Sequence, residues 1–171
     1  ALTHPDRVSR LVLIDSLPDP VRERLVSPLM QRALNTSVPA WLARFGALFV
    51  GNRTMEAVLK EIIFDHTLVT AAVLDRSNRN RQRKDMITPL MSLRDSLPLW
   101  EQHFAPRLKE IRHPTLILWG EQDRLFPPQV GRDLQTTIPQ ARLIMIPEAG
   151  HIPQWEQPQV VNRHITEFLQ P

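Results

Sequence analysis

Three short runs of apolar residues constrain the fold of this chain more than any other feature. They are residues 10–15 (RLVLID), 115–120 (TLILWG) and 142–147 (RLIMIP). Each run is continuous instead of alternating, has the length of a strand, and is bounded by charged residues, proline or glycine. Continuous runs of this length are typical of parallel strands that helices cover on both faces. The sequence therefore predicts an α/β fold with a three-stranded parallel sheet.

Helical patterns separate and follow the predicted strands. Residues 127–139 are long enough for a short crossover helix that starts near Pro128, and residues 97–111 predict a helix that returns the chain to the sheet. Residues 158–171 place apolar side chains on one helical face. Residues 1–9 resemble the tail of a helix followed by a turn. Alternating strands and helices predict right-handed crossovers.

Residues 18–97 contain no convincing strand and are punctuated by prolines. Apolar side chains recur there at helical spacing. We expect residues 1–17 and 98–171 to form a partial sheet core, and residues 18–97 to form a helical cap inserted into it. The apolar sets that mark these helices are Val21, Leu25 and Leu29; Trp41, Phe45 and Phe49; and Met55, Leu59 and Ile63. Core packing is the simpler role for Trp41, Phe45 and Phe49, although lining of a substrate site is an alternative.

The composition excludes several classes of protein. The 171 residues suit one domain and contain no cysteine, which rules out disulfides, a thiolate nucleophile and thiolate metal ligands. A chain without cysteine suits a reducing compartment, so we expect a cytoplasmic protein. No apolar run approaches the ~20 residues of a membrane helix, and the polar first residues do not form a signal peptide.

Residues 76–84 (RSNRNRQRK) form the most basic stretch of a chain whose net charge is only +3. Nucleic-acid binding would make retention on DNA or RNA sensitive to salt. No aromatic residue lies between these arginines, and no nucleic-acid-binding motif accompanies them. A solvated helix face is therefore the better interpretation, and we expect no nucleic-acid partner.

Two residues suited to catalysis follow successive predicted strands. Asp123 comes after residues 115–120, and His151 follows residues 142–147. The carboxyl ends of parallel strands lie at one edge of a sheet, where ligands bind. A carboxylate that accepts the Nδ1 proton of histidine leaves Nε2 as a general base. Either residue alone is better explained as a turn or structural residue, but their order and spacing favour a catalytic pair.

These segments resemble the α/β-hydrolase superfamily. LILWGEQDRLFP (116–127) and PEAGHIPQWEQP (147–158) resemble its acid and histidine loops, and HPDRVSRLVLIDS (4–16) resembles the strand that follows its nucleophile turn. The resemblance covers both ends of the chain, about half its length. It implies that Asp123 is the catalytic acid and His151 the base of a capped hydrolase. It also implies a small apolar ester-like or carbonyl substrate, and no cofactor or metal.

The chain departs from that family in one respect. It contains no G-x-S-x-G or G-x-D-x-G pattern, so the nucleophile elbow is absent. We expect this chain to be the C-terminal half of a hydrolase of ester or carbon–carbon bonds, and to be inactive alone. Haloalkane dehalogenase or epoxide hydrolase chemistry, with an aspartate nucleophile, stays open.

A non-catalytic role is the second hypothesis. The chain would then be a fragment, or a relative without a nucleophile, that binds a small apolar ligand or a partner chain. Residues 11–14 would leave one edge of the sheet unpaired, which predicts self-association.

Other polar and aromatic residues have simpler explanations. Asp15 stands where some superfamily members place their acid, but with Asp123 available it is better interpreted as a loop cap. Trp155 either lines the pocket or anchors the last helix. Five histidines lack partners at metal-ligand spacing and are interpreted as surface or turn residues: His4, His66, His103, His113 and His164.

Overall fold

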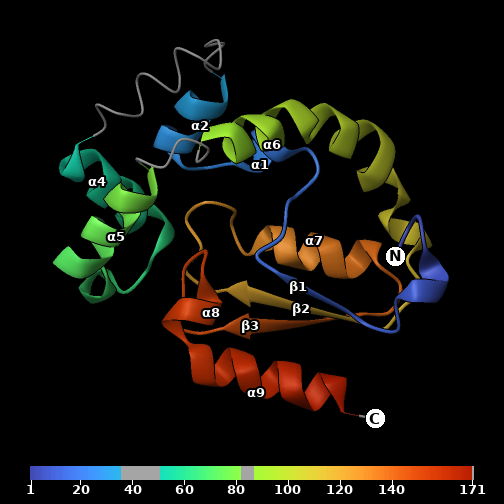
Figure 1. Ribbon diagram of the computed structural model, residues 1–171. Coiled ribbons are helices and arrows are strands. Elements are labelled where there is room, and N and C mark those ends of the chain that lie inside the picture. The colour runs from blue at the N-terminus through green and yellow to red at the C-terminus, as the bar shows by residue number, and fades with distance from the viewer. Residues whose placement is uncertain (36–50, 82–86, 171) are drawn as a thin grey trace.

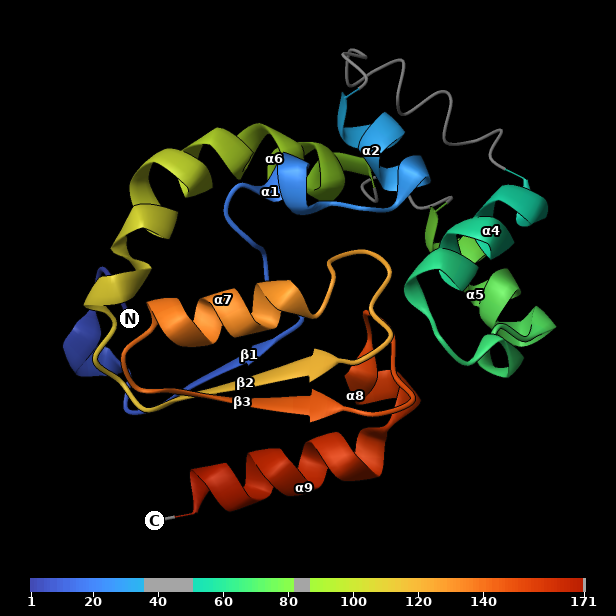
Figure 2. The same ribbon diagram turned by 180° about the vertical axis from the view of Figure 1, so that it is seen from behind.

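One part of the chain is a parallel sheet with helices packed on both of its faces (Figures 1 and 2). The computed structural model describes residues 1–35, 51–81 and 87–170. The strands are β1 (Leu11–Ile14), β2 (Thr115–Gly120) and β3 (Ala141–Ile146), in the order β1-β2-β3. The predicted three-stranded parallel sheet is confirmed, with bounds that differ by at most one residue.

The register of the strands brings their carboxyl ends to one edge. Leu11 pairs with Thr115, which pairs with Ala141, and all pairings are parallel. The residues that follow the strands therefore leave the sheet side by side. This register makes the site possible, because it brings together three loops that are far apart in the sequence.

Alternate side chains of the central strand enter two apolar clusters. Ile117 and Trp119 pack on the side of α7 (Gln129–Thr137), whereas Leu116 and Leu118 pack on the side of α9 (Pro158–Leu169). Every residue of β2 is buried, which explains the continuous apolar run. The two helices lie on opposite faces of the sheet in both views (Figures 1 and 2).

The described parts of residues 18–97 are helical. They contain α1 (Val21–Arg24), α2 (Pro28–Asn35), α4 (Asn52–Ile62), η2 (His66–Leu68), α5 (Ala71–Arg81) and α6 (Ile87–Leu99). The α4–α5 pair lies beyond the carboxyl ends of the strands, near the short helix α8 (Pro153–Glu156) (Figures 1 and 2). The division into cap and core stays a prediction. Trp41, Phe45, Phe49 and residues 82–84 lie outside the described residues.

Two local expectations differ from the structure. Residues 1–4 are not helical, and only a short 3₁₀ turn, η1 (Pro5–Arg7), precedes β1. Pro5 disfavours α geometry in His4, whose φ is −138°. The helix expected over 97–111 is the end of α6 followed by a π-helical turn, η3 (Trp100–Phe104), and a 3₁₀ segment, η4 (Ala105–Glu110). Pro106 lies at the junction of these segments and has no backbone N–H, so it cannot donate a hydrogen bond that would continue an α-helical ladder.

The outer edge of β1 is open within the described part of the chain. Only β2 pairs with it there, and its four residues are partly exposed. A groove of about 290 Å³ beside this edge is lined by apolar side chains, among them Leu11, Leu13, Trp100 and Phe104. None of the described helices is both long and apolar enough to span a membrane.

Candidate active site

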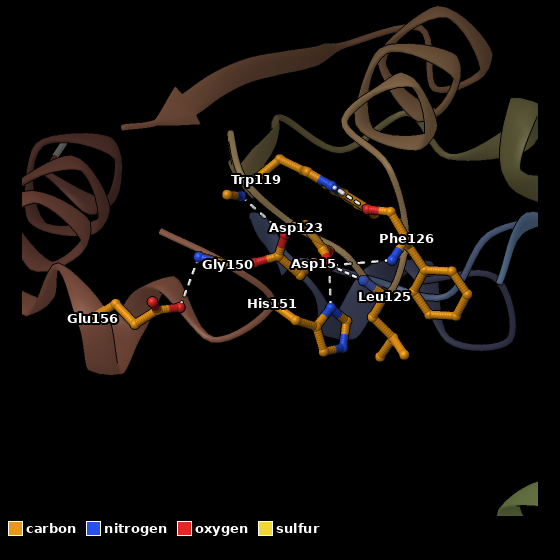
Figure 3. A network of polar contacts seen from close by, with 9 residues as sticks. Asp15, Trp119, Asp123, Leu125, Phe126, Gly150, His151 and Glu156 are labelled. Atoms are coloured by element: carbon orange, nitrogen blue, oxygen red, sulfur yellow. Dashed lines mark hydrogen bonds and ion pairs between the residues drawn. The ribbon is translucent and has the colours of Figure 1, made fainter. Parts of the chain in front are cut away.

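Three loops that follow the strands bring Asp15, Asp123 and His151 together. One side-chain ligand atom from each residue lies within 4.8 Å of the other two. Figure 3 shows the three side chains converging at the carboxyl edge of the sheet. The structure thus brings together both residues that the sequence indicated, and adds Asp15.

The loop after β2 folds around the Asp123 carboxylate. Its Oδ1 accepts hydrogen bonds from the backbone N–H groups of Leu125 (2.7 Å) and Phe126 (3.1 Å). Aspartate in a tight turn satisfies nearby amides in this way. The side chain is fully buried, so the loop fixes both the position and the orientation of the carboxylate.

His151 completes the pair from the loop after β3. Its Nδ1 lies 2.9 Å from Asp123 Oδ2. An ionised carboxylate only accepts hydrogen bonds, so Nδ1 carries the proton and Nε2 keeps a free lone pair. The Phe126 ring meets the imidazole edge-on, with centroids 5.7 Å apart. The His151 side chain is 21% exposed. This arrangement suits a histidine that takes up and returns protons.

Hydrogen bonds and a close backbone approach join the loop that carries Asp123 to the loop that carries His151. The Gln122 side chain accepts from the Ala149 amide (3.0 Å), and the Gln122 amide donates to the Ala149 carbonyl (2.9 Å). A β-carbon on Gly120 would lie only 2.0 Å from the Gly150 carbonyl oxygen, so only glycine allows this approach. Neither Gln122 nor Gly120 could be identified from the sequence, because neither contact follows a local periodic pattern.

Asp15 is a buried carboxyl group with few partners. It is 7% exposed and has a φ of 37°, and its Oδ1 accepts from the Gly120 amide (3.0 Å). Oδ2 is buried and has no hydrogen-bond partner. Burial, together with the nearby charges of Asp123 and Glu156, raises the pKa of Asp15 from 3.8 to about 8 against the opposing Gly120 amide. Asp15 is therefore protonated at neutral pH.

The interpretation of Asp15 as a local loop cap is wrong. Its hydrogen bond reaches the end of the neighbouring strand, 105 residues away in the sequence. The acid that holds the His151 ring is Asp123 and not Asp15. A protonated Asp15 can donate through Oδ2 toward the Asp123 carboxylate, which would leave the Asp123 charge in place.

Metal binding is an alternative role for this cluster. Within the described residues, the ligand atoms of Asp15, Asp123 and His151 lie close enough together to be considered as a metal site. Their contacts favour proton transfer over metal binding. Nδ1 already donates to Asp123, and a protonated Asp15 is a poor ligand because metal binding requires the carboxylate form.

The other residues singled out from the sequence lie outside this convergence. Trp155 is 36% exposed. His66 contacts the Lys60 carbonyl, His113 contacts the Pro5 carbonyl, and His164 lies 3.6 Å from Glu167. Glu156, which no sequence pattern indicated, accepts a hydrogen bond of 2.7 Å from the Gly150 amide beside His151 (Figure 3).

Comparison with known proteins places this geometry in a family. Residues 1–158 match the family described as alpha/beta hydrolase fold. A 2-hydroxy-6-oxo-6-phenylhexa-2,4-dienoate hydrolase of Burkholderia cepacia is 28% identical over 170 residues, which cover 99% of this chain and 57% of that protein. A 2-hydroxy-6-oxononadienedioate/2-hydroxy-6-oxononatrienedioate hydrolase of Comamonas testosteroni is 32% identical over 117 residues, 68% of this chain and 41% of that protein. The chain thus spans about half the length of these curated relatives.

Solved structures share the fold at low sequence identity. MGS-M2, an alpha/beta hydrolase enzyme from a Medee basin deep-sea metagenome library, matches with a TM-score of 0.70 and 21% identity, covering 99% of this chain and 59% of that chain. A variant of the meta-cleavage product hydrolase CumD matches with a TM-score of 0.64 and 20% identity, covering 98% and 59%. Since the family match covers residues 1–158, most of the sequence, this chain belongs to the alpha/beta hydrolase fold family.

Proposed function

We propose that this chain supplies the acid and the base of a hydrolase that cleaves ester or carbon–carbon bonds next to a carbonyl group. One observation carries the proposal: the hydrogen bond of 2.9 Å between His151 Nδ1 and Asp123 Oδ2 at the carboxyl edge of the sheet. The nucleophile would come from a segment outside these 171 residues, because the chain has no G-x-S-x-G pattern.

The proposed reaction follows from the free Nε2 of His151. Nε2 takes the proton of a serine hydroxyl as the serine oxygen attacks the substrate carbonyl carbon. The bond from that carbon to the leaving group breaks, and the leaving oxygen or carbon receives the proton from His151. Water then attacks the acyl carbon and gives a proton to Nε2, and Nε2 passes this proton to the serine oxygen as the acyl–oxygen bond breaks and the acid is released. Asp123 stabilises the imidazolium in both halves of the reaction.

The names of the relatives favour a carbon–carbon bond as the target. Both relatives described above are named as hydrolases of 2-hydroxy-6-oxo compounds, which carry a carbonyl group. The apolar side chains of Leu125 and Phe126 lie beside the pair (Figure 3), and they suit a mainly apolar substrate. An ester is the second substrate class, since the same acyl transfer serves both.

The test uses the longer protein that carries this chain. The protein is assayed with a 2-hydroxy-6-oxo-dienoate and with p-nitrophenyl butyrate, as wild type and as His151→Ala. We expect hydrolysis of at least one substrate and a loss of kcat of about 10³-fold or more in the variant. Equal activity of the two proteins would overturn the proposal. The 171-residue chain alone is expected to be inactive.

The identity of the nucleophile needs a separate experiment. A single turnover in H₂¹⁸O places the label in the product acid when the nucleophile is serine. With an aspartate nucleophile, as in haloalkane dehalogenases and epoxide hydrolases, water attacks the carboxyl carbon of the intermediate and the label enters the enzyme. The product of the first turnover therefore separates the two branches.

The open edge of β1 favours a second, non-catalytic candidate for the isolated chain. Unpaired strand edges next to apolar surface promote association, and the groove beside Leu11 and Leu13 is apolar. Binding of another copy or a partner chain there predicts a dimer or larger species in light scattering. A monomer at high concentration would contradict this candidate.

A further inference from the structure

Glu156 joins two parts of the molecule that are far apart in the sequence. Its Oε1 accepts a hydrogen bond from the Gly150 amide (2.7 Å), immediately before His151. Its Oε2 accepts from the amides of Phe64 (2.6 Å) and Asp65 (3.0 Å). Both carboxylate oxygens are thus occupied, one by the histidine loop and the other by the segment that follows α4.

The backbone of His151 contacts the same segment directly. Its amide donates to the Ile62 carbonyl at 2.7 Å. Ile62 is the last residue of α4, and its carbonyl has no acceptor role inside the helix because the helix ends there. The His151 amide therefore caps the C-terminal end of α4 by donating a hydrogen bond to one of the free carbonyl groups there. The catalytic ring and the helix end share one hydrogen-bonded junction.

Gly150 allows this junction to close. A β-carbon at this position would lie 2.6 Å from the Ile62 carbonyl oxygen and 2.9 Å from the Phe64 nitrogen. Both distances are shorter than real side chains permit, so residues 62–64 approach the histidine loop backbone to backbone. The close approach of residues 62–64 thus requires glycine at the position before His151.

The junction is anchored on both sides. On the cap side, Ile63 is 1% exposed, which fixes the backbone that presents the amides of Phe64 and Asp65. On the core side, α8 begins with the buried Pro153 and ends at Glu156. Hydrogen bonds from amides to a charged carboxylate are stronger than neutral ones. Three such bonds on one side chain make Glu156 the main polar link between these segments.

We propose that Glu156 is a positioning residue that ties the placement of the His151 ring to the end of α4. Its two oxygens hold Gly150 and residues 64–65 in a fixed relation, and the His151 amide follows Ile62 through its own hydrogen bond. A displacement of the α4 end then moves His151 relative to Asp123. The catalytic meaning of this coupling rests on the proposed function, but the coupling itself does not.

Amide hydrogen exchange measured by NMR tests the coupling without a substrate. The proteins are the wild type, Glu156→Ala, Glu156→Gln and the control Glu121→Gln. Glu121 is exposed, and its side chain makes no hydrogen bond or ion pair with the described residues. The control therefore removes the same charge near the same edge without touching the junction.

In Glu156→Ala we expect exchange of the Gly150, Phe64, Asp65 and His151 amides to accelerate at least about tenfold. The Thr115 amide, bonded to the Gln140 carbonyl at the opposite end of the sheet, serves as the reference and should not change. Glu156→Gln keeps one carbonyl oxygen and should lose protection on one side of the junction. It preserves the shape of the side chain if the alanine variant fails to fold.

A second measurement distinguishes a role of Glu156 in positioning the His151 ring from a role in structural support alone. The ¹⁵N shifts of the His151 ring report which nitrogen carries the proton. We expect the Nδ1–H form to dominate in the wild type and in Glu121→Gln, and a mixture of tautomers in Glu156→Ala. Unchanged ring shifts despite faster amide exchange would overturn the positioning role. Unchanged amide exchange in both Glu156 variants would overturn the junction itself.

The proposed function can fail independently of this inference. If the longer protein hydrolyses nothing, the exchange and tautomer results still decide whether Glu156 couples the two segments. If it is active, Glu156→Ala is expected to lower kcat by about tenfold or more with a smaller change in KM, because a misplaced base affects the reaction more than binding.

Discussion

The loops after β1 and β2 both place an aspartate at the same edge of the sheet, and the two carboxyl groups have different surroundings. Asp15 and Asp123 are almost equally buried, with exposures of 7% and 5%. Asp123 accepts hydrogen bonds from two backbone amides and from the His151 ring. Asp15 accepts one, from the Gly120 amide, and its second oxygen has no partner.

The two carboxyl groups thus differ in the number of hydrogen-bond donors that they meet and hardly in the degree of burial. Three N–H donors replace the water that a buried charge loses. One donor does not, and burial raises the pKa of Asp15 to about 8. The loops after adjacent strands thus present one carboxylate that contacts the His151 ring and one carboxyl group, Asp15, that is neutral at neutral pH and makes no hydrogen bond to that ring.

The substitution Asp123→Asn is expected to have the largest effect. An amide can donate to Nδ1, which favours the wrong histidine tautomer, so kcat of the longer protein should fall by about 10³- to 10⁴-fold. The matched variant Asp15→Asn should change kcat by less than about tenfold, because it replaces one neutral group by another. Steady-state kinetics with the best substrate of the proposed class measures both. Equal losses in the two variants would remove the distinction between the carboxyl groups.

Gly120 lies between the two aspartate loops, and Gly120→Ala tests how tightly they are joined. Its amide donates to Asp15, while an added β-carbon would meet the backbone oxygens of Gly150 at 2.0 Å and Ala149 at 2.6 Å. We expect a loss of about 3 kcal/mol in the free energy of unfolding, at the upper end of the range for overpacked sites. Urea denaturation measures it. Gly51→Ala is the control, since a β-carbon there meets nothing within 4 Å; similar losses in both would contradict a close junction.

The pH dependence of stability should distinguish Asp15 from an ordinary aspartate. Its pKa is about 8 in the folded chain and 3.8 for the unperturbed group, so unfolding releases a proton between these values. The stabilisation is fully present below about pH 4 and is lost as the pH rises through about 8. Relative to Asp15→Asn, the wild type should lose up to about 1.4 kcal/mol of unfolding free energy per pH unit. Urea denaturation of both proteins at pH 5, 6 and 7 gives the slopes, and parallel slopes would show an ionised Asp15.

The sequence predicted the parts of this site that depend on local pattern. The continuous run of β2 and the order of Asp123 and His151 after successive strands were sufficient, because parallel pairing brings such loops together. The neutral state of Asp15 and the contacts of Glu156 could not be predicted in this way. Both depend on partners 105 and about 90 residues away, Gly120 and the amides of Phe64 and Asp65, whose positions are set by packing and not by spacing.

The smallest expected effect is a difference between the pH profiles of kcat for the wild type and Asp15→Asn, which tests whether Asp15 is neutral at neutral pH. Asn keeps an oxygen for the Gly120 amide, is neutral like a protonated Asp15, and tolerates the positive φ of this position. Between pH 5 and 7 the profiles of kcat for wild type and Asp15→Asn should therefore agree within about twofold. Above about pH 8 they should diverge, because only the wild type acquires a second negative charge beside Asp123. A shift of the acidic limb in Asp15→Asn would show that the variant had removed a charge, and Asp15 would then be ionised at neutral pH. The carboxyl ¹³C shift of Asp15, followed from pH 4 to 10, decides the same question without a substrate, and a midpoint near 4 would contradict the neutral assignment.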